Sequence, residues 1–262
     1  MIGLVLVAGI YCSMKYIVAP YQREKQIAAD LQSHGGYAYL KFCGPKWIPQ
    51  FVLRRVPVWD RIDRVGISRQ SVPASLIADL GTLSEVTLIH VDLEGTASGD
   101  AELHAYAHLT KLTRLELRGT KITDTGLQHV RGLTNLTYLG LRETVVTDVG
   151  MAHLSGLMKL EILDLRDTAV GNDGLRPLQG LPLRSLLLNY CAVTDAGLET
   201  LPELPRLQRI ELKHTGVTDA GLKHLQQMTG LRFIGLEYTT TTSKGREQLR
   251  SALPSCVIEP VP

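Results

Sequence analysis

Three arginines recur at one fixed spacing and are the side chains best suited to bind a partner. They are Arg118, Arg142 and Arg166, each 24 residues from the next. Arginine presents a rigid fork of N–H donors and is among the residue types that most often contribute binding energy at protein interfaces. Acidic residues such as Glu143 and Asp167 lie close in sequence. The pattern therefore predicts either a recognition patch or a solvated face of mutually neutralised ion pairs.

Further candidate binding residues share this spacing. We expect their side chains on one face of a repeated strand, where they offer charged, polar, aromatic and apolar contacts. The predicted binding residues are Arg114, Glu116, Arg118, Tyr138, Arg142, Ile162, Asp164, Arg166, Leu187, Asn189, Tyr190, Arg209, Glu211, Lys213 and Phe233.

The sequence gives less support to a catalytic or metal-binding site than to a protein-binding surface. His104 and His108 lie four residues apart, with Asp100 and Glu102 nearby, but two imidazoles need a third converging ligand to hold a metal ion. A metal-dependent enzyme built on these histidines and residues 90–100 is therefore the weakest alternative. The four cysteines lack CxxC spacing, and Cys191 is expected to be a buried structural thiol. We expect no catalytic residue, no metal and no cofactor.

A repeated unit positions these side chains. The stretch LTRLELRGTKITDTGLQHVRGLTN begins at Leu112 and is followed by copies that begin at Leu136, Leu160, Leu183 and Leu207, with a degenerate copy at Leu231. The period is 24 residues, with one copy of 23. A fixed period in this range is typical of solenoids, in which each repeat packs against its neighbours.

The repeat reads as a strand, a turn and a helix. Numbered from the first leucine, positions 1, 4 and 6 are apolar and predict a strand with one buried face, so positions 3, 5 and 7 point away from the core. Threonine at position 9 is expected to bond loop backbone. The TDxGL motif predicts a helix start capped by its threonine or aspartate, and glycine at position 15 predicts a close approach of the neighbouring repeat.

Weaker copies lie upstream. IDRVGI from Ile62 and LSEVTL from Leu83 place apolar residues at positions 1, 4 and 6. The 29 residues from Leu83 to the next copy predict an inserted loop, HVDLEGTASGD, and this register assigns Ile89 to the outward position 7. Near the other end, Cys256, Val257 and Ile258 predict a closing strand.

The N-terminal region predicts a membrane anchor followed by a cap. Residues 2–14 are uncharged, Lys15 interrupts them, and the apolar run extends to Pro20, which approaches the length of a membrane span. A cleaved signal peptide and a buried helix are the alternatives. We expect a single-pass anchor and leave the side of the membrane open, although the basic residues after the run favour cytoplasmic repeats.

The cap is expected to shield the open end of the first repeat. A helix is predicted over residues 21–34, then a strand, YAYLKF, and a proline-containing segment, GPKWIPQFVLRRVPVW. A separate ligand-binding lobe is the alternative. The predicted organisation is an anchor over residues 1–19, a helix and cap over 20–61, repeats over 62–256 and a tail over 257–262.

The repeats resemble the ribonuclease-inhibitor-like class of leucine-rich repeats, LxxLxLxxTxVTDxGLxxLxxLxx, seen in outline in F-box proteins of the cysteine-containing type. The N-terminal part of the chain is similar to that of membrane-anchored bacterial leucine-rich-repeat proteins. The similarity rests on the short hydrophobic segment, on QREKQIAADLQSHGG and on GPKWI. The resemblance implies an α/β solenoid of about eight repeats, a right-handed horseshoe whose concave parallel sheet binds protein and whose helices lie on the convex side.

The expected function is a non-enzymatic scaffold that binds a protein partner through the concave face and is tethered to a membrane. The net charge of +2 gives no overall field that favours nucleic acid, so no nucleic-acid partner is expected. An extracytoplasmic sensor or adhesion domain for peptide or glycan is the alternative. An F-box-like adaptor role is a remote one, because nothing like an F-box precedes the repeats.

Overall fold

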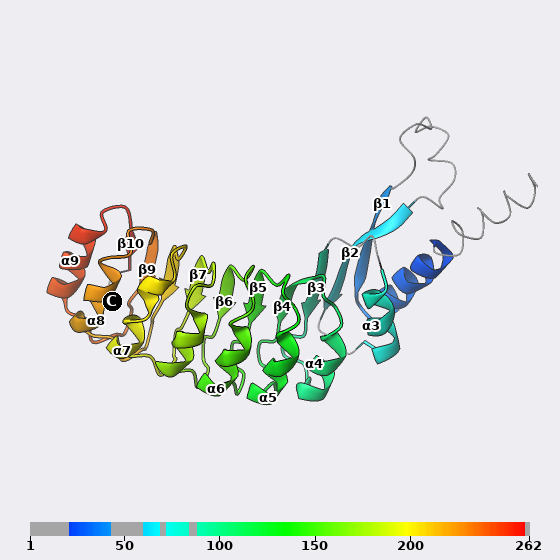
Figure 1. The fold of residues 1–262 in the computed structure, drawn as a ribbon, viewed down its shortest axis with the longest axis horizontal. Helices are drawn as coiled ribbons and strands as arrows, with labels where there is room; N and C mark the ends of the chain where they lie inside the picture. The colour runs from blue at the N-terminus through cyan, green and yellow to red at the C-terminus, as the bar shows by residue number, and fades with distance from the viewer. Residues whose placement is uncertain (1–20, 43–59, 69–71, 84–87, 260–262) are drawn as a thin grey trace, which may run out of the picture.

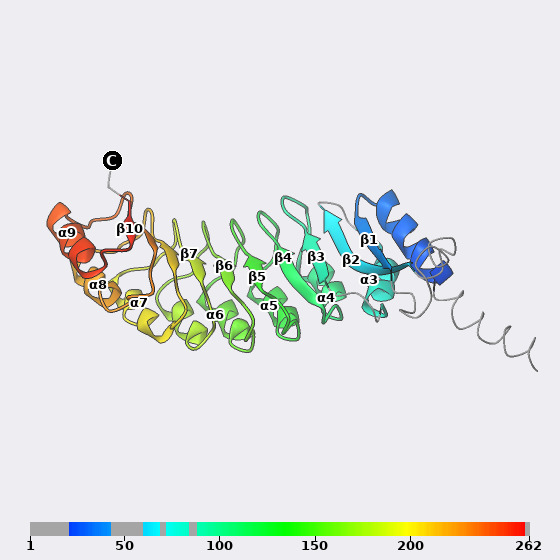
Figure 2. The ribbon, with the colours of Figure 1, turned by 90° about the horizontal axis from the view of Figure 1, so that it is seen from above.

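The computed structural model describes residues 21–42, 60–68, 72–83 and 88–259. Strands follow one another along one side of an elongated body, and short helices line the other side (Figure 1). Seen from above, the row of strands follows a shallow arc (Figure 2). The predicted solenoid of parallel strands and helices is confirmed. The predicted anchor and the GPKWI segment lie outside the described residues, and the domain boundaries stay predictions.

One sheet contains all ten strands of the described residues in chain order, and every neighbouring pair from β2 onwards is parallel. The strands are β1 (Tyr37–Phe42), β2 (Asp60–Ser68), β3 (Leu88–Asp92), β4 (Leu112–Glu116), β5 (Tyr138–Gly140), β6 (Ile162–Asp164), β7 (Ser185–Leu187), β8 (Arg209–Glu211), β9 (Phe233–Gly235) and β10 (Val257–Ile258).

The return segments are short helical turns. Residues 21–33 are helical, and the later helices are α3 (Ala74–Gly81), α4 (Asp100–Tyr106), α5 (Asp124–Leu127), η2 (Gln128–Val130), α6 (Asp148–Met151), η3 (Ala152–Leu154), η4 (Asp173–Leu178), α7 (Asp195–Leu198), η5 (Leu201–Glu203), α8 (Asp219–Leu225) and α9 (Ser243–Ala252). Several repeats thus continue one α turn as a 3₁₀ turn, which shortens the helix expected from the sequence.

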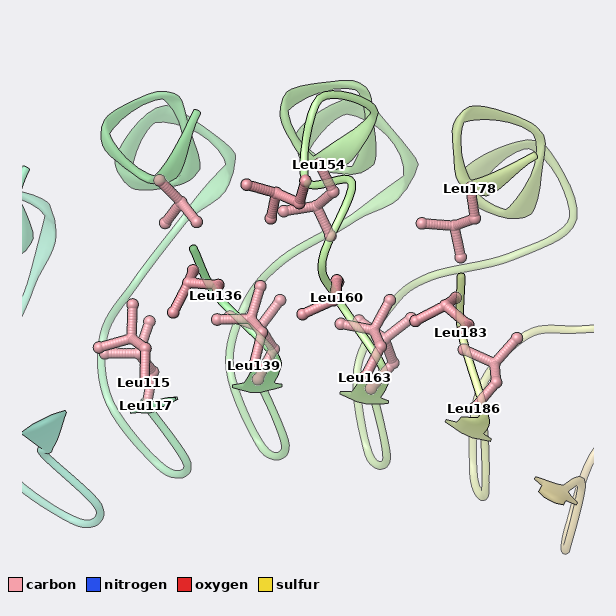
Figure 3. Close-up of a cluster of buried hydrophobic side chains, with 14 of the residues drawn as sticks. Leu115, Leu117, Leu136, Leu139, Leu154, Leu160, Leu163, Leu178, Leu183 and Leu186 are labelled. Carbon is pink, nitrogen blue, oxygen red and sulfur yellow. The ribbon is translucent and has the colours of Figure 1, made fainter. Parts of the chain in front are cut away.

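The core is a stack of identical leucine layers. Leu115, Leu139 and Leu163 point from successive strands towards the helical turns and are fully buried. Leu154 and Leu178 enter the same layer from the helical side (Figure 3). Because removing apolar surface from water is the main driving force of folding, each repeat is stable only against its neighbours.

A ladder of hydroxyl groups closes the turn after each strand. Thr120, Thr144, Thr168 and Thr215 each donate from Oγ1 to the carbonyl oxygen three residues earlier, at 2.6 Å. Cys191 occupies the same position, and burial raises the pKa of its thiol. The predicted bonding of position 9 to loop backbone is confirmed. The carbonyls of Leu117 and Leu141 also accept from the backbone N of the same threonine, at 3.2 and 3.3 Å, so two hydrogen bonds close each of these turns.

A second ladder joins most neighbouring repeats through the aspartate at position 13. At the two exceptions, Asp148 accepts only from Gly171 N, at 2.6 Å, and Asn172 replaces the aspartate and accepts from Thr194 N, at 2.9 Å. The carboxylate of Asp100 accepts from Thr123 N at 2.9 Å and from Thr123 Oγ1 at 2.6 Å. Asp124 binds Thr147 in the same way, at 2.8 and 2.7 Å. The same two bonds recur between Asp195 and Thr218 and between Asp219 and Thr242. We call each such pair an aspartate clamp.

The clamp also assigns the helix cap and explains the glycine at position 15. Thr123 Oγ1 accepts from Thr125 N at 3.2 Å, so the threonine caps its own helix while the aspartate binds the next repeat. A Cβ atom on Gly126 would overlap the Asp100 carboxylate, and Gly150 faces Asp124 in the same way. The predicted close approach is confirmed, and the neighbouring group is a carboxylate.

The register predicted at Leu83 is wrong. The strand there is β3, in which Ile89 pairs with Leu112 and Val91 pairs with Leu115. Ile89 is therefore buried, not outward-facing. The residues predicted to form an inserted loop are the strand end, turn and first helical residue of a repeat of ordinary length, since Asp100 lies 24 residues before Asp124. Two apolar alternations overlap in this stretch, and only packing selects between them.

Both ends of the solenoid are covered. The helix predicted over residues 21–34 spans residues 21–33. Its Ile27 and Leu31 join the core, and buried Glu24 accepts from Ile62 N at 2.9 Å. The predicted strand YAYLKF is β1, which pairs antiparallel with β2. At the other end the predicted closing strand is β10, although the sequence assigned Val257 and Ile258 to a tail.

No helix within the described ranges, which begin at residue 21, has the length and apolar composition needed to cross a membrane.

Replacing Gly245 by alanine tests the aspartate clamp. A Cβ atom at this position would overlap Oδ1 and Cγ of Asp219. We expect Gly245→Ala to lower the free energy of unfolding by about 1–3 kcal/mol, although alanine is otherwise preferred to glycine within a helix. Urea unfolding followed by circular dichroism measures the change.

The matched control is Gly132→Ala, because nothing lies within 4 Å of a Cβ atom there. We expect it to change the free energy of unfolding by less than about 0.5 kcal/mol. In an Asp219→Ala background, Gly245→Ala should lose most of its cost. An equal cost in both backgrounds would show that the carboxylate is not the obstacle.

Candidate interaction surface

The sheet presents one face of outward side chains, which we call the open face. It consists of strand positions 3, 5 and 7 in the repeats from Leu112 to Glu237, and alternation separates these positions from the buried leucines. Arg114 is exposed, whereas Leu115 beside it is fully buried. All fifteen predicted binding residues belong to this face except Tyr190, which follows position 7 at the edge of the sheet.

Two arginines of the predicted ladder lie in a chain of alternating charge. Arg118 lies 3.1 Å from Glu94 and 3.2 Å from Glu143. Arg142 lies 3.0 Å from Glu143 and 3.2 Å from Asp167. Hydrogen bonding to Arg118 lowers the pKa of the Glu143 carboxyl, and the same bond raises the pKa of Arg118. These contacts favour the interpretation of this part of the ladder as a solvated ion-pair face.

Arg166 differs because its partner is buried. Its Nε and Nη2 atoms donate to the two oxygens of Asp164 at 2.9 and 2.5 Å, and its backbone N donates to Oδ1 at 3.2 Å. Asp164 is only 3% exposed, so these donors replace the hydrogen bonds that its carboxylate would otherwise make with water. Hydrogen bonding to Asp164 raises the pKa of Arg166. Arg166 therefore has a structural role on the open face.

An arginine, an aromatic ring, a glutamate and a glycine form a compact group across β4 and β5. The Arg114 guanidinium carbon lies 3.4 Å from the centre of the Tyr138 ring, in a cation–π contact. Tyr138 Oη donates to Glu116 Oε2 at 2.5 Å, and burial followed by this bond raises the pKa of Tyr138. Glu116 extends over Gly140, where any Cβ atom would overlap it.

The same group recurs across β8 and β9. The Arg209 guanidinium carbon lies 3.9 Å from the centre of the Phe233 ring, and Arg209 also forms an ion pair with Glu211. Gly235 takes the position that Gly140 has in the first group. The open face thus has two arginine–aromatic groups, four repeats apart and at the same strand positions.

Apolar side chains lie between the two groups. Ile162 on β6 and Leu187 on β7 are both half-buried, and Leu187 pairs with Asp164 across the sheet. Half-exposed apolar side chains beside aligned arginine and aromatic groups have the composition of a protein-binding surface.

Hydrogen bonds and an ion pair hold two further predicted residues, Asn189 and Lys213, in place. Asn189 donates from Nδ2 to Glu211 Oε2 at 2.7 Å and accepts from Lys213 N at 2.8 Å. The Lys213 ammonium lies 2.8 Å from Glu237, and the hydrogen bond to this carboxylate stabilises the charged form and raises the pKa of Lys213. These residues hold the turns of neighbouring repeats together.

An aromatic stack at position 8 was only partly predicted. The Tyr190, His214 and Tyr238 rings stack with centroids 4.6 and 4.4 Å apart and interplanar angles of 19° and 10°. All three residues have a positive φ, as do Glu143 and Asp167 at the same repeat position. Tyr190 was among the predicted residues and His214 was not, although their common 24-residue phase was visible in the sequence.

The structure does not assemble the histidines into a metal site. His104 and His129 approach with their Nδ1 atoms 3.3 Å apart, but Asp100 is engaged in a clamp and Glu102 accepts from Gly99 N at 2.9 Å. Within the described ranges, no group of three histidine, cysteine, aspartate or glutamate side chains is arranged to hold a metal ion.

Sequence comparisons identify the repeats. A family model described as leucine rich repeat matches residues 110–170, and a second model of that description matches residues 182–201. The chain therefore contains leucine-rich repeats. Curated protein sequences give no match.

Two solved structures with a similar fold are internalins from Listeria monocytogenes. The match to InlF has 19% identity and a TM-score of 0.54, and it covers 81% of this chain but 66% of the InlF chain. The match to internalin C2 has 22% identity and a TM-score of 0.53, with 70% of this chain and 72% of that chain covered. At these identities the likeness shows the fold alone.

The buried carboxylate predicts unequal roles for the ladder arginines. Arg166→Ala leaves Asp164 without its two side-chain donors, and we expect it to lower the free energy of unfolding by about 1–3 kcal/mol. Arg118→Ala removes only exposed ion pairs and should cost less than about 1 kcal/mol. Urea unfolding of both variants measures the difference, and equal costs would contradict the assignment of Arg166 as a structural residue.

Proposed function

We propose that this chain is a non-enzymatic scaffold that binds another protein through the open face. Leucine-rich-repeat proteins with an internalin-like fold are in general protein-interaction scaffolds. The observation that carries the proposal is the pair of arginine–aromatic groups, Arg114 with Tyr138 and Arg209 with Phe233, on either side of Ile162 and Leu187. A partner that covers this area gains apolar burial at its centre and charged or aromatic contacts at both ends.

Both arginines are already held in position over a ring. Arg114 is exposed although its guanidinium contacts Tyr138, so it can donate to a partner without first losing its conformational freedom. Arg118 and Arg142 have acidic neighbours on both sides and offer less to a partner. The proposed contact area is therefore centred on strand positions 3 and 5. The predicted arginine ladder occupies position 7, at the end of the strands.

The ribonuclease-inhibitor-like subtype, the right-handed horseshoe and the membrane tether are parts of the same proposal. The tether rests on the uncharged run over residues 2–14. A sensor or adhesion domain for peptide or glycan is the alternative, and protease accessibility of the repeats in intact cells separates the two by locating the repeats.

Leu187→Glu tests the open face. A charge at the centre of a desolvated contact is costly, so we expect about a tenfold or greater loss in the amount of a specific partner captured. Full-chain affinity capture from native lysate, quantified by mass spectrometry, measures it. Val149→Glu is the matched control, because Val149 is 72% exposed and lies on helix α6, away from the sheet. A partner lost equally with both variants, or with Val149→Glu alone, would contradict binding at the open face.

The tether predicts a change in fractionation. The full chain should stay in the membrane pellet after alkaline carbonate extraction, whereas a chain that begins at Tyr21 should move to the supernatant. Circular dichroism of the shortened chain checks that it is folded. Release of the full chain by carbonate would remove the support for an anchor.

A further inference from the structure

A pocket of about 300 Å³ lies between helices α3 and α4, away from the open face. These helices are neighbours at the N-terminal end of the solenoid (Figure 1). Val72, Ile77 and Tyr106 are buried and form its apolar floor, and exposed Ala101 and Glu102 lie at its mouth. A hollow of this size is at the lower end of the range for small-molecule sites.

The pocket arises because one repeat lacks a core side chain. Ser98 occupies position 11, where the following repeats have a buried branched residue, as at Ile122, Val146 and Val170. Ser98 is itself buried, at 7% exposure, but it does not fill the volume of isoleucine or valine. Protein interiors are otherwise closely packed, so this repeat is an exception.

The same repeat places a phenol at the pocket. Tyr106 occupies position 19, where Val130 and Leu154 lie in the next two repeats. The side chain is only 2% exposed and lines the pocket, and its hydroxyl is not among the fully buried polar atoms without a partner in the part of the chain that the structure describes. The hydroxyl therefore lies at the solvent-reached wall of the pocket, where it can donate to a bound molecule.

The other polar groups of the pocket are already engaged. The Ser98 hydroxyl forms a hydrogen bond with Thr96 Oγ1 at 2.8 Å. Glu102 Oε2 accepts from Gly99 N at 2.9 Å. Burial, followed by the charge of Glu102, raises the pKa of Tyr106 to about 12. The phenol is therefore a neutral donor at physiological pH, and the nearby carboxylate disfavours an anionic ligand.

We propose that this pocket binds a small, neutral, mainly apolar molecule that accepts one hydrogen bond from Tyr106. The apolar floor excludes strongly solvated ligands, and the single available donor selects a ketone, ester or amide oxygen. A cavity of about 150 Å³ accommodates a benzene ring, so the ligand class corresponds to about two fused rings. The site is independent of the function proposed for the sheet.

The probe for the test is 2-acetylnaphthalene, which has two fused rings and one ketone acceptor. The full chain is placed in lipid nanodiscs, so that no free detergent competes, and alanine methyl groups are labelled for NMR. Ala101 and Ala105 line the pocket, and the distant Ala192 reports non-specific effects. We expect saturable shifts at the first two methyl groups and none at the third.

Two pocket variants and one control locate the binding. Ser98→Val restores the branched residue of the other repeats and should abolish the saturable shifts. Tyr106→Phe should weaken 2-acetylnaphthalene about three- to tenfold, the range for one lost hydrogen bond, and should leave 2-ethylnaphthalene, which lacks the ketone, unchanged. Tyr138→Phe removes a hydroxyl on the open face and should leave both probes unchanged.

Thermal melts confirm that each variant is folded. The absence of saturable shifts at Ala101 and Ala105 would overturn the proposal, and so would equal shifts in Ser98→Val. Equal affinity of Tyr106→Phe and the unmodified chain for 2-acetylnaphthalene would overturn the assignment of Tyr106 as the donor.

Discussion

The carboxylate that reaches from one repeat into the next is the interaction on which this solenoid depends. In each aspartate clamp, one side chain satisfies a backbone amide and a hydroxyl of the following turn, as Asp124 does for Thr147. Neither repeat can slide along the other without breaking two charge-assisted hydrogen bonds, which are stronger than neutral ones. The leucine layers supply the apolar burial, whereas the clamps fix the register.

The clamp also decides which residues are allowed elsewhere in the repeat. Glycine is needed at position 15 wherever a carboxylate precedes it, as Asp100 precedes Gly126. The repeat that contains Asp100 has glutamate at this position, Glu102, because Ala74 begins the preceding helix and brings no carboxylate. Its threonine is likewise replaced by Gly99. The clamp ladder begins at Asp100, because the helix of the repeat before it begins with Ala74 and supplies no carboxylate.

Charge on the open face is organised pair by pair. The chain has nearly equal numbers of basic and acidic residues, and neighbouring repeats place them in contact, as Arg118 with Glu143 and Arg142 with Asp167. An arginine available to a partner is therefore one held by an aromatic ring, and Arg114 over Tyr138 is such a residue. Arg114 also lies 3.8 Å from Glu116, and Arg209 forms an ion pair with Glu211, so the aromatic rings distinguish these two arginines from the others, not a lack of acidic neighbours.

The sequence by itself determined the repeat and the environment of most of its positions. From Leu112 onwards, the period identified the buried leucines, the hydroxyl ladder, the outward residues and the close approach at glycine, because each copy independently shows which residue types a position accepts. It also predicted the strands at both ends. These features depend on local alternation and spacing, which are properties of the chain alone.

Only the tertiary structure decided what lies across the boundary between repeats. A strict period does not tell whether Asp124 binds its own helix or the next turn, because both distances along the chain recur identically. Nor does it show that Arg166 holds a buried carboxylate, or that Ile89, not Leu83, pairs with Leu112. The sequence placed Ser98 in an inserted loop. The packing shows that it occupies position 11 of a repeat, where the following repeats have a buried branched residue. Each of these depends on neighbours brought together by stacking.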